Sequence, residues 1–155
     1  MGQPKIVDKR NSSEVGEYAI SFAARDSSGN DYDHAFIVWY YSDPQHLRTN
    51  RKGAGFYPVG GDAYDLTIGG TTGKVFDDSR ERIAKEIIVL VNSDIFAAAQ
   101  AVQSQYETGQ TYRLLVNDCV SFVAAVANTI PSLFVPDRIT NITPSTFISS
   151  MFDGN

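Results

Sequence analysis

The sequence has few of the residues that dominate small metal-binding and disulfide-linked proteins: one cysteine and two histidines among 155 residues. A single cysteine cannot form an intrachain disulfide, so packing alone must stabilise the fold. Zinc sites combine cysteine and histidine at short spacings, and no such cluster occurs. We therefore expect neither a metal nor another cofactor.

Long apolar runs and an excess of positive charge are also missing. No stretch approaches the roughly 18 consecutive apolar residues of a membrane-spanning helix, so no integral membrane segment is expected. The first ten residues lack the apolar segment of a secretory signal. This predicts a protein that is cytoplasmic as synthesised, or one exported by a route without a classical signal peptide. The formal net charge of -5 argues against nucleic acid as a partner.

The composition is that of one globular domain, with 43% hydrophobic and 20% charged residues. Residues 1–13 are polar and predict a flexible N-terminus, and residues 14–155 predict a single domain. We find no internal repeat, low-complexity tract or linker.

Strand patterns dominate the first part of the chain and helix patterns the last part. Runs rich in β-branched and aromatic residues predict strands at Val15–Ala24, His34–Tyr41, Gly55–Val59 and Ile83–Val91, with shorter extended pieces at Tyr64–Ile68 and Tyr112–Val116. Asp26–Asn30 is a turn signal. Apolar residues at helical spacing predict helices from Ser93 to about Gly109, over 118–130 and over 145–152. This order indicates an α+β fold with a mostly antiparallel sheet.

Cys119 stands where an extended apolar run ends and a helical pattern begins. The unpaired N–H groups and the positive dipole end of a helix N-terminus lower a thiol pKa and favour the nucleophilic thiolate. A structural role is the alternative, because Cys119 is also in register with the apolar face of its helix, with Phe122 and Val126.

His34 begins the apolar run that ends at Tyr41. A histidine at a strand end can simply bond a nearby carbonyl, which is its structural alternative. Together, however, Cys119 and His34 supply the minimum apparatus of thiol-based acyl transfer.

The residues around this pair carry a family resemblance. The segment Asn117-Asp-Cys119-Val-Ser-Phe122 resembles the cysteine-helix signature of the circularly permuted NlpC/P60 group in the papain-like superfamily, related to lecithin retinol acyltransferase-like and PPPDE-like families. In that group the histidine strand precedes the cysteine helix, as His34 precedes Cys119 here, and Asp33-His-Ala-Phe-Ile-Val38 is similar to the histidine strand. Asp118 separates Asn117 from the cysteine, and Asp33 stands where a glycine is common.

The resemblance implies a papain-like fold, with a mostly antiparallel sheet packed against the cysteine helix, and a cysteine hydrolase. Cys119 would attack an acyl carbon as a thiolate, and His34 would act as base and then as acid. The backbone N–H of Cys119 would bind the oxyanion. Asn117 and Asp118 are candidates for oxyanion binding or positioning, although Asn117 can equally end the strand or cap the helix.

The same families place a third polar residue on the strand after the histidine, and two candidates fit. The spacing between His34 and His46 is similar to that in several of these relatives. His46 falls in a predicted turn, however, so it can be an exposed loop residue. Tyr57 would lie nearly opposite His34 if the two strands pair. Four aspartates, Asp62, Asp65, Asp77 and Asp78, match no calcium loop and are expected to be surface loop residues.

Three functions remain open from the sequence. The first is an amidase or peptidase acting on bacterial cell-wall peptide as a secreted toxin or effector, with a secretion apparatus or an immunity protein as partner by analogy. The second is a lecithin retinol acyltransferase-like acyltransferase, thioesterase or lipase, so the substrate is a peptide or an acyl compound. The third is a non-catalytic papain-like binding module in which Cys119 is merely buried.

Overall fold

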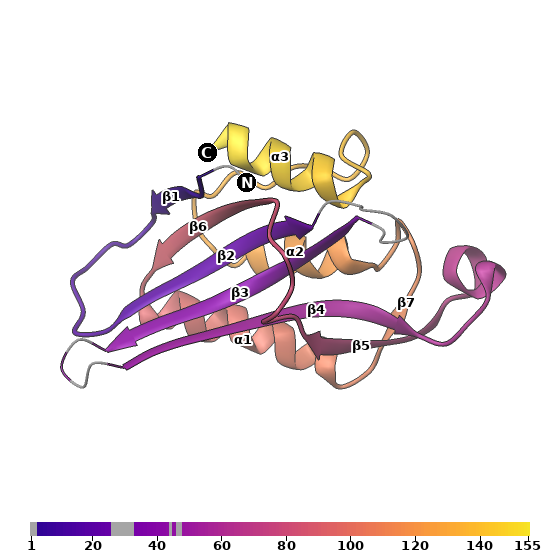
Figure 1. The fold of residues 1–155 in the computed structure, drawn as a ribbon, viewed down its shortest axis with the longest axis horizontal. Helices are drawn as coiled ribbons and strands as arrows, with labels where there is room; N and C mark the ends of the chain where they lie inside the picture. Colours follow the sequence, from indigo (N-terminus) through magenta and orange to yellow (C-terminus); the bar gives the residue numbers. More distant parts are fainter. Residues whose placement is uncertain (1–2, 26–32, 44, 46–47) are drawn as a thin grey trace.

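A computed structural model describes residues 3–25, 33–43, 45 and 48–155. Seven strands in this part of the chain form one sheet in the order β1-β6-β2-β3-β4-β5-β7. The ladders are antiparallel except for the parallel pairing of β1 with β6. The expected α+β class with a mostly antiparallel sheet is therefore observed (Figure 1). The predicted turn at Asp26–Asn30 lies outside the described residues.

The centre of the sheet consists of β2 (Glu17–Arg25), β3 (His34–Asp43) and β4 (Arg48–Val59). The first two match the predicted strands, because their β-branched and aromatic residues pack on both faces. The predicted strand Gly55–Val59 is only the last part of β4. The rest of β4 extends the pairing with β3 as far as Asp43 and Arg48, so both strands are longer than predicted.

The glycine-rich region is more ordered than its composition predicts. The expected extended piece Tyr64–Ile68 is wrong, because η1 (Asp65–Gly69) is a short π-helix. Asp62 and Asp65 begin it by exchanging bonds between side chains and backbone N–H groups at 3.0 and 3.2 Å. The strand β5 (Thr71–Asp77) follows and pairs with both β4 and β7 (Gln110–Tyr112).

The N-terminal segment is tied to the sheet. Residues Lys5–Asp8 form β1, which pairs with Ile87–Leu90 of β6 (Lys85–Val91). The expectation of a flexible N-terminus over residues 1–13 therefore fails for this strand. Its alternating exposed and half-buried residues are those of a short edge strand, which is polar enough to resemble a loose tail.

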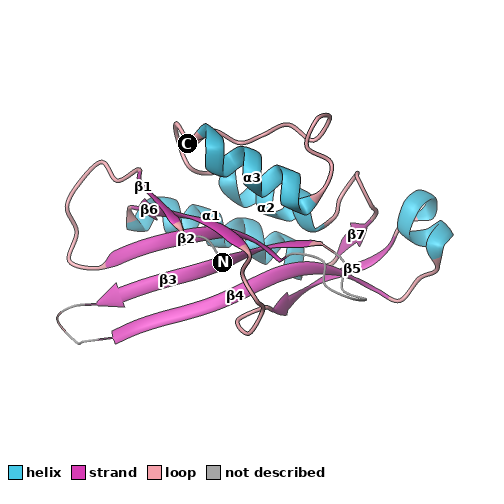
Figure 2. Cartoon of the chain, turned by 45° about the horizontal axis from the view of Figure 1, so that its top comes forward, coloured by secondary structure: helices cyan, strands magenta, loops and turns pink. Residues whose placement is uncertain are grey.

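Three helices cover one face of the sheet: α1 (Ser93–Glu107), α2 (Cys119–Ala127) and α3 (Pro144–Gly154). All three were predicted, α2 being shorter than expected, and Figure 2 shows them gathered on the same side of the strands. Their buried side chains and one face of the strands form the main core. None of the helices in the described part of the chain is long and apolar enough to cross a membrane.

The connection from β5 to β6, residues 78–84, crosses the opposite face of the sheet in front of β4, β3 and β2 (Figure 1). It is fixed at both ends, by a bond from the Asp78 N–H to the Gly53 carbonyl and by one from the Ala84 N–H to the Ala24 carbonyl, at 3.0 and 2.9 Å. A salt bridge between Arg25 and Glu81 fastens its middle at 2.7 Å. Both faces of the sheet centre are thus covered.

Candidate functional site

The beginning of α2 meets the beginning of β3 at one end of the sheet. The backbone N–H groups of Ala35 and Val120 lie close enough to the Cys119 sulfur to oppose the rise in the pKa of its thiol. Ala35 follows His34 directly in the chain, so the structure brings the thiol to the start of the predicted histidine strand. The hydroxyl of Ser145, in the first turn of α3, also bonds Asp33 just before His34 at 3.1 Å.

The thiol is sealed at this position. Cys119 is 7% exposed, and burial raises the pKa of its thiol to about 11. The neighbouring charge of Asp118 adds to the increase, while the N–H groups and Arg138 oppose it. The direction is opposite to that expected from the helix N-terminus, because removal of the thiolate from water outweighs the dipole. At rest the group is a neutral thiol.

His34 is buried and firmly held. Its Nε2 bonds Oδ2 of Asp78 at 2.9 Å, and the hydroxyl of Tyr57 donates to Oδ1 of the same carboxylate at 2.6 Å. The rings of His34 and Tyr57 stack with centroids 4.4 Å apart. The predicted proximity of Tyr57 to His34 is therefore confirmed. Burial, followed by the bond to Asp78, raises the pKa of Tyr57, so this phenol stays protonated.

Asp78 is the residue that sequence reasoning missed. The expectation that it lies in a surface loop is wrong, because only 4% of it is exposed. The crossing connection passes over Gly53 and Gly55 of β4, whose missing side chains leave room for Asp78. The two glycines in alternate positions of one strand are the signal that something packs closely on that face.

The imidazole and the thiol approach β3 from different faces of the sheet. Side chains alternate along a strand, so His34 shares its face with Phe36, whose ring centroid is 5.8 Å away. Ala35 and Ile37 face the helices and Cys119. The β3–β4 ladder begins only at Ile37 and Ala54, and Cys119 reaches the Ala35 N–H beyond this point. In the part of the chain that the structure describes, no hydrogen bond joins the sulfur to the imidazole.

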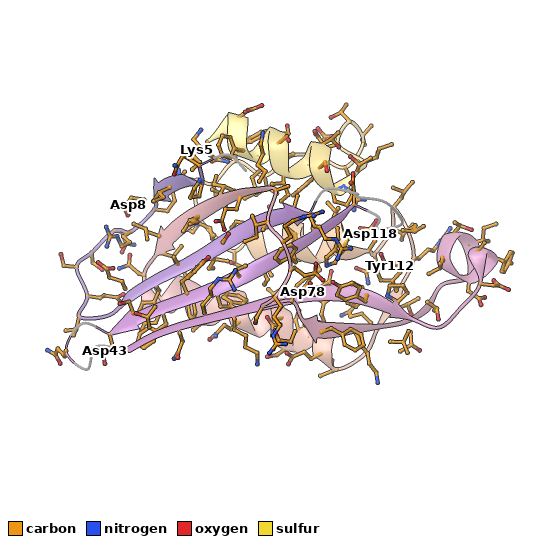
Figure 3. The ribbon with its side chains drawn as sticks, in the orientation of Figure 1. Lys5, Asp8, Asp43, Asp78, Tyr112 and Asp118 are labelled. Atoms are coloured by element: carbon orange, nitrogen blue, oxygen red, sulfur yellow. The ribbon has the colours of Figure 1, made fainter. Side chains whose placement is uncertain are left out.

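Tyr112, at the end of β7, is a second residue that sequence reasoning missed. It is buried, and the Cys119 backbone N–H lies near its hydroxyl oxygen. Burial and then the adjacent Cys119 charge raise the pKa of this phenol. A protonated hydroxyl therefore lies near the N–H group of Cys119. Figure 3 labels Tyr112 and also Asp118, the residue before Cys119.

Asn117 and Asp118 both have structural partners. The Asn117 side-chain amide donates to the Thr111 carbonyl at 2.9 Å, and its oxygen accepts from the Tyr106 hydroxyl at 3.0 Å. It fixes the segment before α2, which is the structural alternative that the sequence allowed. Asp118 caps α2 by accepting from the Ser121 N–H at 3.1 Å. An ionised carboxylate accepts hydrogen bonds only, so Asp118 cannot donate to an oxyanion, and positioning is the role left to it.

His46 lies outside the described residues. Within the described ranges, no group of three or more histidine, cysteine or acidic residues is arranged to hold a metal ion. Comparison of the chain with family models, with curated proteins and with solved structures gave no match. The arrangement around Cys119 and His34 therefore carries the functional argument.

Proposed function

We propose that this protein is a cysteine hydrolase in which Cys119 is the nucleophile, His34 the general base and acid, and Asp78 the residue that orients the imidazole. One observation carries the proposal: the N–H group of Ala35, the residue directly after His34, lies beside the Cys119 sulfur and acts to lower its pKa, while Asp78 holds the His34 ring at 2.9 Å. A nucleophile, a base and a group that fixes the base form the constellation of acyl-transfer enzymes.

The bond to Asp78 favours the tautomer of the imidazole that suits a base. A carboxylate that accepts from Nε2–H leaves Nδ1 unprotonated and available as the base. Because the thiol is neutral at rest, the sulfur must lose its proton as it attacks the acyl carbon. Nδ1 can accept that proton only once the imidazole and the thiol, which lie on different faces of β3 at rest, have come within reach of each other. The imidazolium then protonates the leaving amine, and water cleaves the thioester to regenerate the thiol. In this mechanism the thiol is deprotonated only during the attack, whereas in a thiolate–imidazolium pair it is already ionised at rest.

Two donors next to the sulfur suit the developing oxyanion. The Cys119 N–H and the Tyr112 hydroxyl lie next to each other. A substrate oxygen placed between them can accept from the N–H group and from the phenolic O–H together. Tyr112 thus fills the role of second donor.

An amide in a peptide is the proposed substrate, and bacterial cell-wall peptide is the class that the permuted NlpC/P60 resemblance suggests. The test is incubation of the purified chain with peptidoglycan, followed by mass analysis of the released fragments. Cys119→Ala is the matched inactive control. New fragments from the natural chain alone support the proposal, and unchanged muropeptides contradict this substrate.

A second candidate, an acyltransferase, thioesterase or lipase, is favoured by exposed aliphatic side chains near the nucleophile. They lie on the two segments that meet at Asp118, and they are Leu114, Leu115, Val116, Ile139 and Ile142. Apolar side chains in water suit an acyl chain better than a polar peptide. Release of fatty acid from phospholipid vesicles, with intact muropeptides, would favour this candidate.

The burial of Cys119 favours the third candidate, a non-catalytic binding module. An enzyme and a binding module can be distinguished by alkylating the native chain with iodoacetamide and measuring how His34→Ala changes the rate. A catalytic pair predicts slower alkylation without the imidazole, and an inert buried cysteine predicts no change until the protein unfolds.

A further inference from the structure

The residue before the nucleophile carries a charge that helix capping does not require. Asp118 is 4% exposed and caps α2, a task that a neutral asparagine or serine performs about as well. Burying a carboxylate without a counter-ion is costly. The buried Asp118 carboxylate beside Cys119 therefore needs a positively charged partner.

Arg138 is that partner. It lies in the irregular segment between α2 and α3, and its guanidinium reaches back to the first turn of α2. Nη1 donates to Oδ1 of Asp118 at 2.8 Å and Nη2 donates to Oδ2 at 3.0 Å, a two-point bond that fixes orientation as well as distance. Nη1 also donates to the Ser121 hydroxyl at 3.1 Å.

The same carboxylate fixes the chain on the other side of the nucleophile. Oδ2 of Asp118 accepts from the Leu115 N–H at 2.9 Å. Leu115 has φ of 66°, in the left-handed region that a branched residue avoids unless its surroundings hold it there. Asp118 and Arg138 thus fasten the turn before α2, the first turn of α2 and the segment before α3 at one point.

We propose that Arg138 is a positioning residue for the nucleophile: it ties the first turn of α2 to the segment before α3 and neutralises the Asp118 carboxylate beside Cys119. The catalytic meaning of this inference rests on the proposed function. The two charges act on the thiol in opposite directions, since the Asp118 charge raises the Cys119 pKa and the Arg138 charge lowers it.

Other groups near the sulfur do not reproduce this effect. Tyr112, from β7, stays protonated because burial raises the pKa of its phenol. His34, at the start of β3, is bound to Asp78 of the crossing connection on the opposite face. Both groups are unchanged in the variants below, so a shift between variants reports on Asp118 and Arg138.

The experiment measures the rate of Cys119 alkylation by iodoacetamide in the full chain, from pH 6 to 10. A shift of one pKa unit changes the thiolate fraction about tenfold, so Arg138→Gln should slow alkylation at pH 8 about tenfold and Asp118→Asn should accelerate it about tenfold. The double variant should lie within about threefold of the natural chain, because both charges are gone.

Shifts in the same direction for both single variants, or no shift in either, overturn the inference, since a purely structural role loosens the site alike in both. Thermal unfolding checks that each variant folds. If Arg138→Gln does not fold, Arg138→Lys keeps the cation and should stay within about threefold of the natural chain, while Asp118→Asn must still accelerate. Alkylation needs no substrate, so the pattern can hold even where hydrolysis is absent, and the two failures remain distinguishable.

Discussion

Gly55 leaves the space in which the Asp78 carboxylate lies. A Cβ atom built on Gly55 would overlap Oδ2 of Asp78 and stand 2.7 Å from Nε2 of His34. A glycine in the middle of β4 thereby permits the hydrogen bond on which the proposed base depends.

Gly55→Ala should therefore displace Asp78 and free the imidazole. We expect hydrolysis to fall about 100-fold, the scale of a misplacement of about 1 Å at a reacting group. Gly16→Ala is the matched control, because its Cβ would meet the side chains of Tyr41 and Tyr18, at 3.0 and 3.4 Å, and no group of the proposed site. Equal activity of both variants would contradict the role of the His34–Asp78 bond.

Asp78→Asn should keep the shape of the site but reverse the tautomer of His34. The asparagine amide can donate to Nε2, which moves the ring proton to Nδ1 and removes the base. We expect kcat to fall by up to about 10⁴-fold. Tyr57→Phe keeps the stacked ring and loses one bond to Asp78, so its loss should be about tenfold or less. A larger effect in Tyr57→Phe than in Asp78→Asn would exclude Asp78 as the orienting residue.

The buried thiol predicts a pH dependence of stability. Burial raises the pKa of Cys119 from 9.0 to about 11, so between these values the unfolded chain has lost its thiol proton while the folded chain keeps it. The free energy of unfolding therefore falls as the pH rises through this window, by up to about 3 kcal/mol. Urea unfolding at pH 8 and 11 measures this fall. The same measurement on Cys119→Ala separates the contribution of the thiol from that of the tyrosines. Parallel curves for the two proteins would contradict the burial of the sulfur.

Tyr112→Phe removes the hydroxyl beside the Cys119 N–H and leaves the ring in the core. If the phenol stabilises the oxyanion, kcat should fall about 10- to 1000-fold with KM unchanged. A raised KM with unchanged kcat would instead indicate a contact to the bound substrate. Steady-state rates on the cleaved substrate distinguish the two.

Asn117→Ala tests the structural role of this amide. The variant loses the bonds to Thr111 and Tyr106 and should be destabilised by about 1–3 kcal/mol. Thermal unfolding measures the loss. Activity per folded molecule should stay close to that of the natural chain. A large fall in kcat with unchanged stability would instead support a role for Asn117 in binding the oxyanion.

Periodicity was enough to predict the elements that carry the core. The strands around Ile20, Ile37 and Val89 and the helix that begins at Cys119 follow from their apolar patterns. Tyr57 could be placed beside His34 because antiparallel pairing fixes register along both strands.

The remaining parts depend on contacts that are distant in sequence. The strand Thr71–Asp77 forms between two neighbours although its surroundings are rich in glycine, so its partners override its composition. In the sequence, Asp78 is one of two adjacent acidic residues that look like surface loop residues. In the structure, the crossing connection places its carboxylate against Gly55. The partner of Asp118, Arg138, lies in a segment without periodicity, and only the fold brings it back to α2.

The pairing of β1 with β6 has a consequence for the newborn polypeptide. The first strand emerges from the ribosome with no neighbour to join, and it must wait until residues 87–90 have been translated. The strands of the described sheet are all translated before Arg138, which pairs with Asp118 at the start of α2. The strands can therefore pair before the ion pair beside Cys119 is able to form.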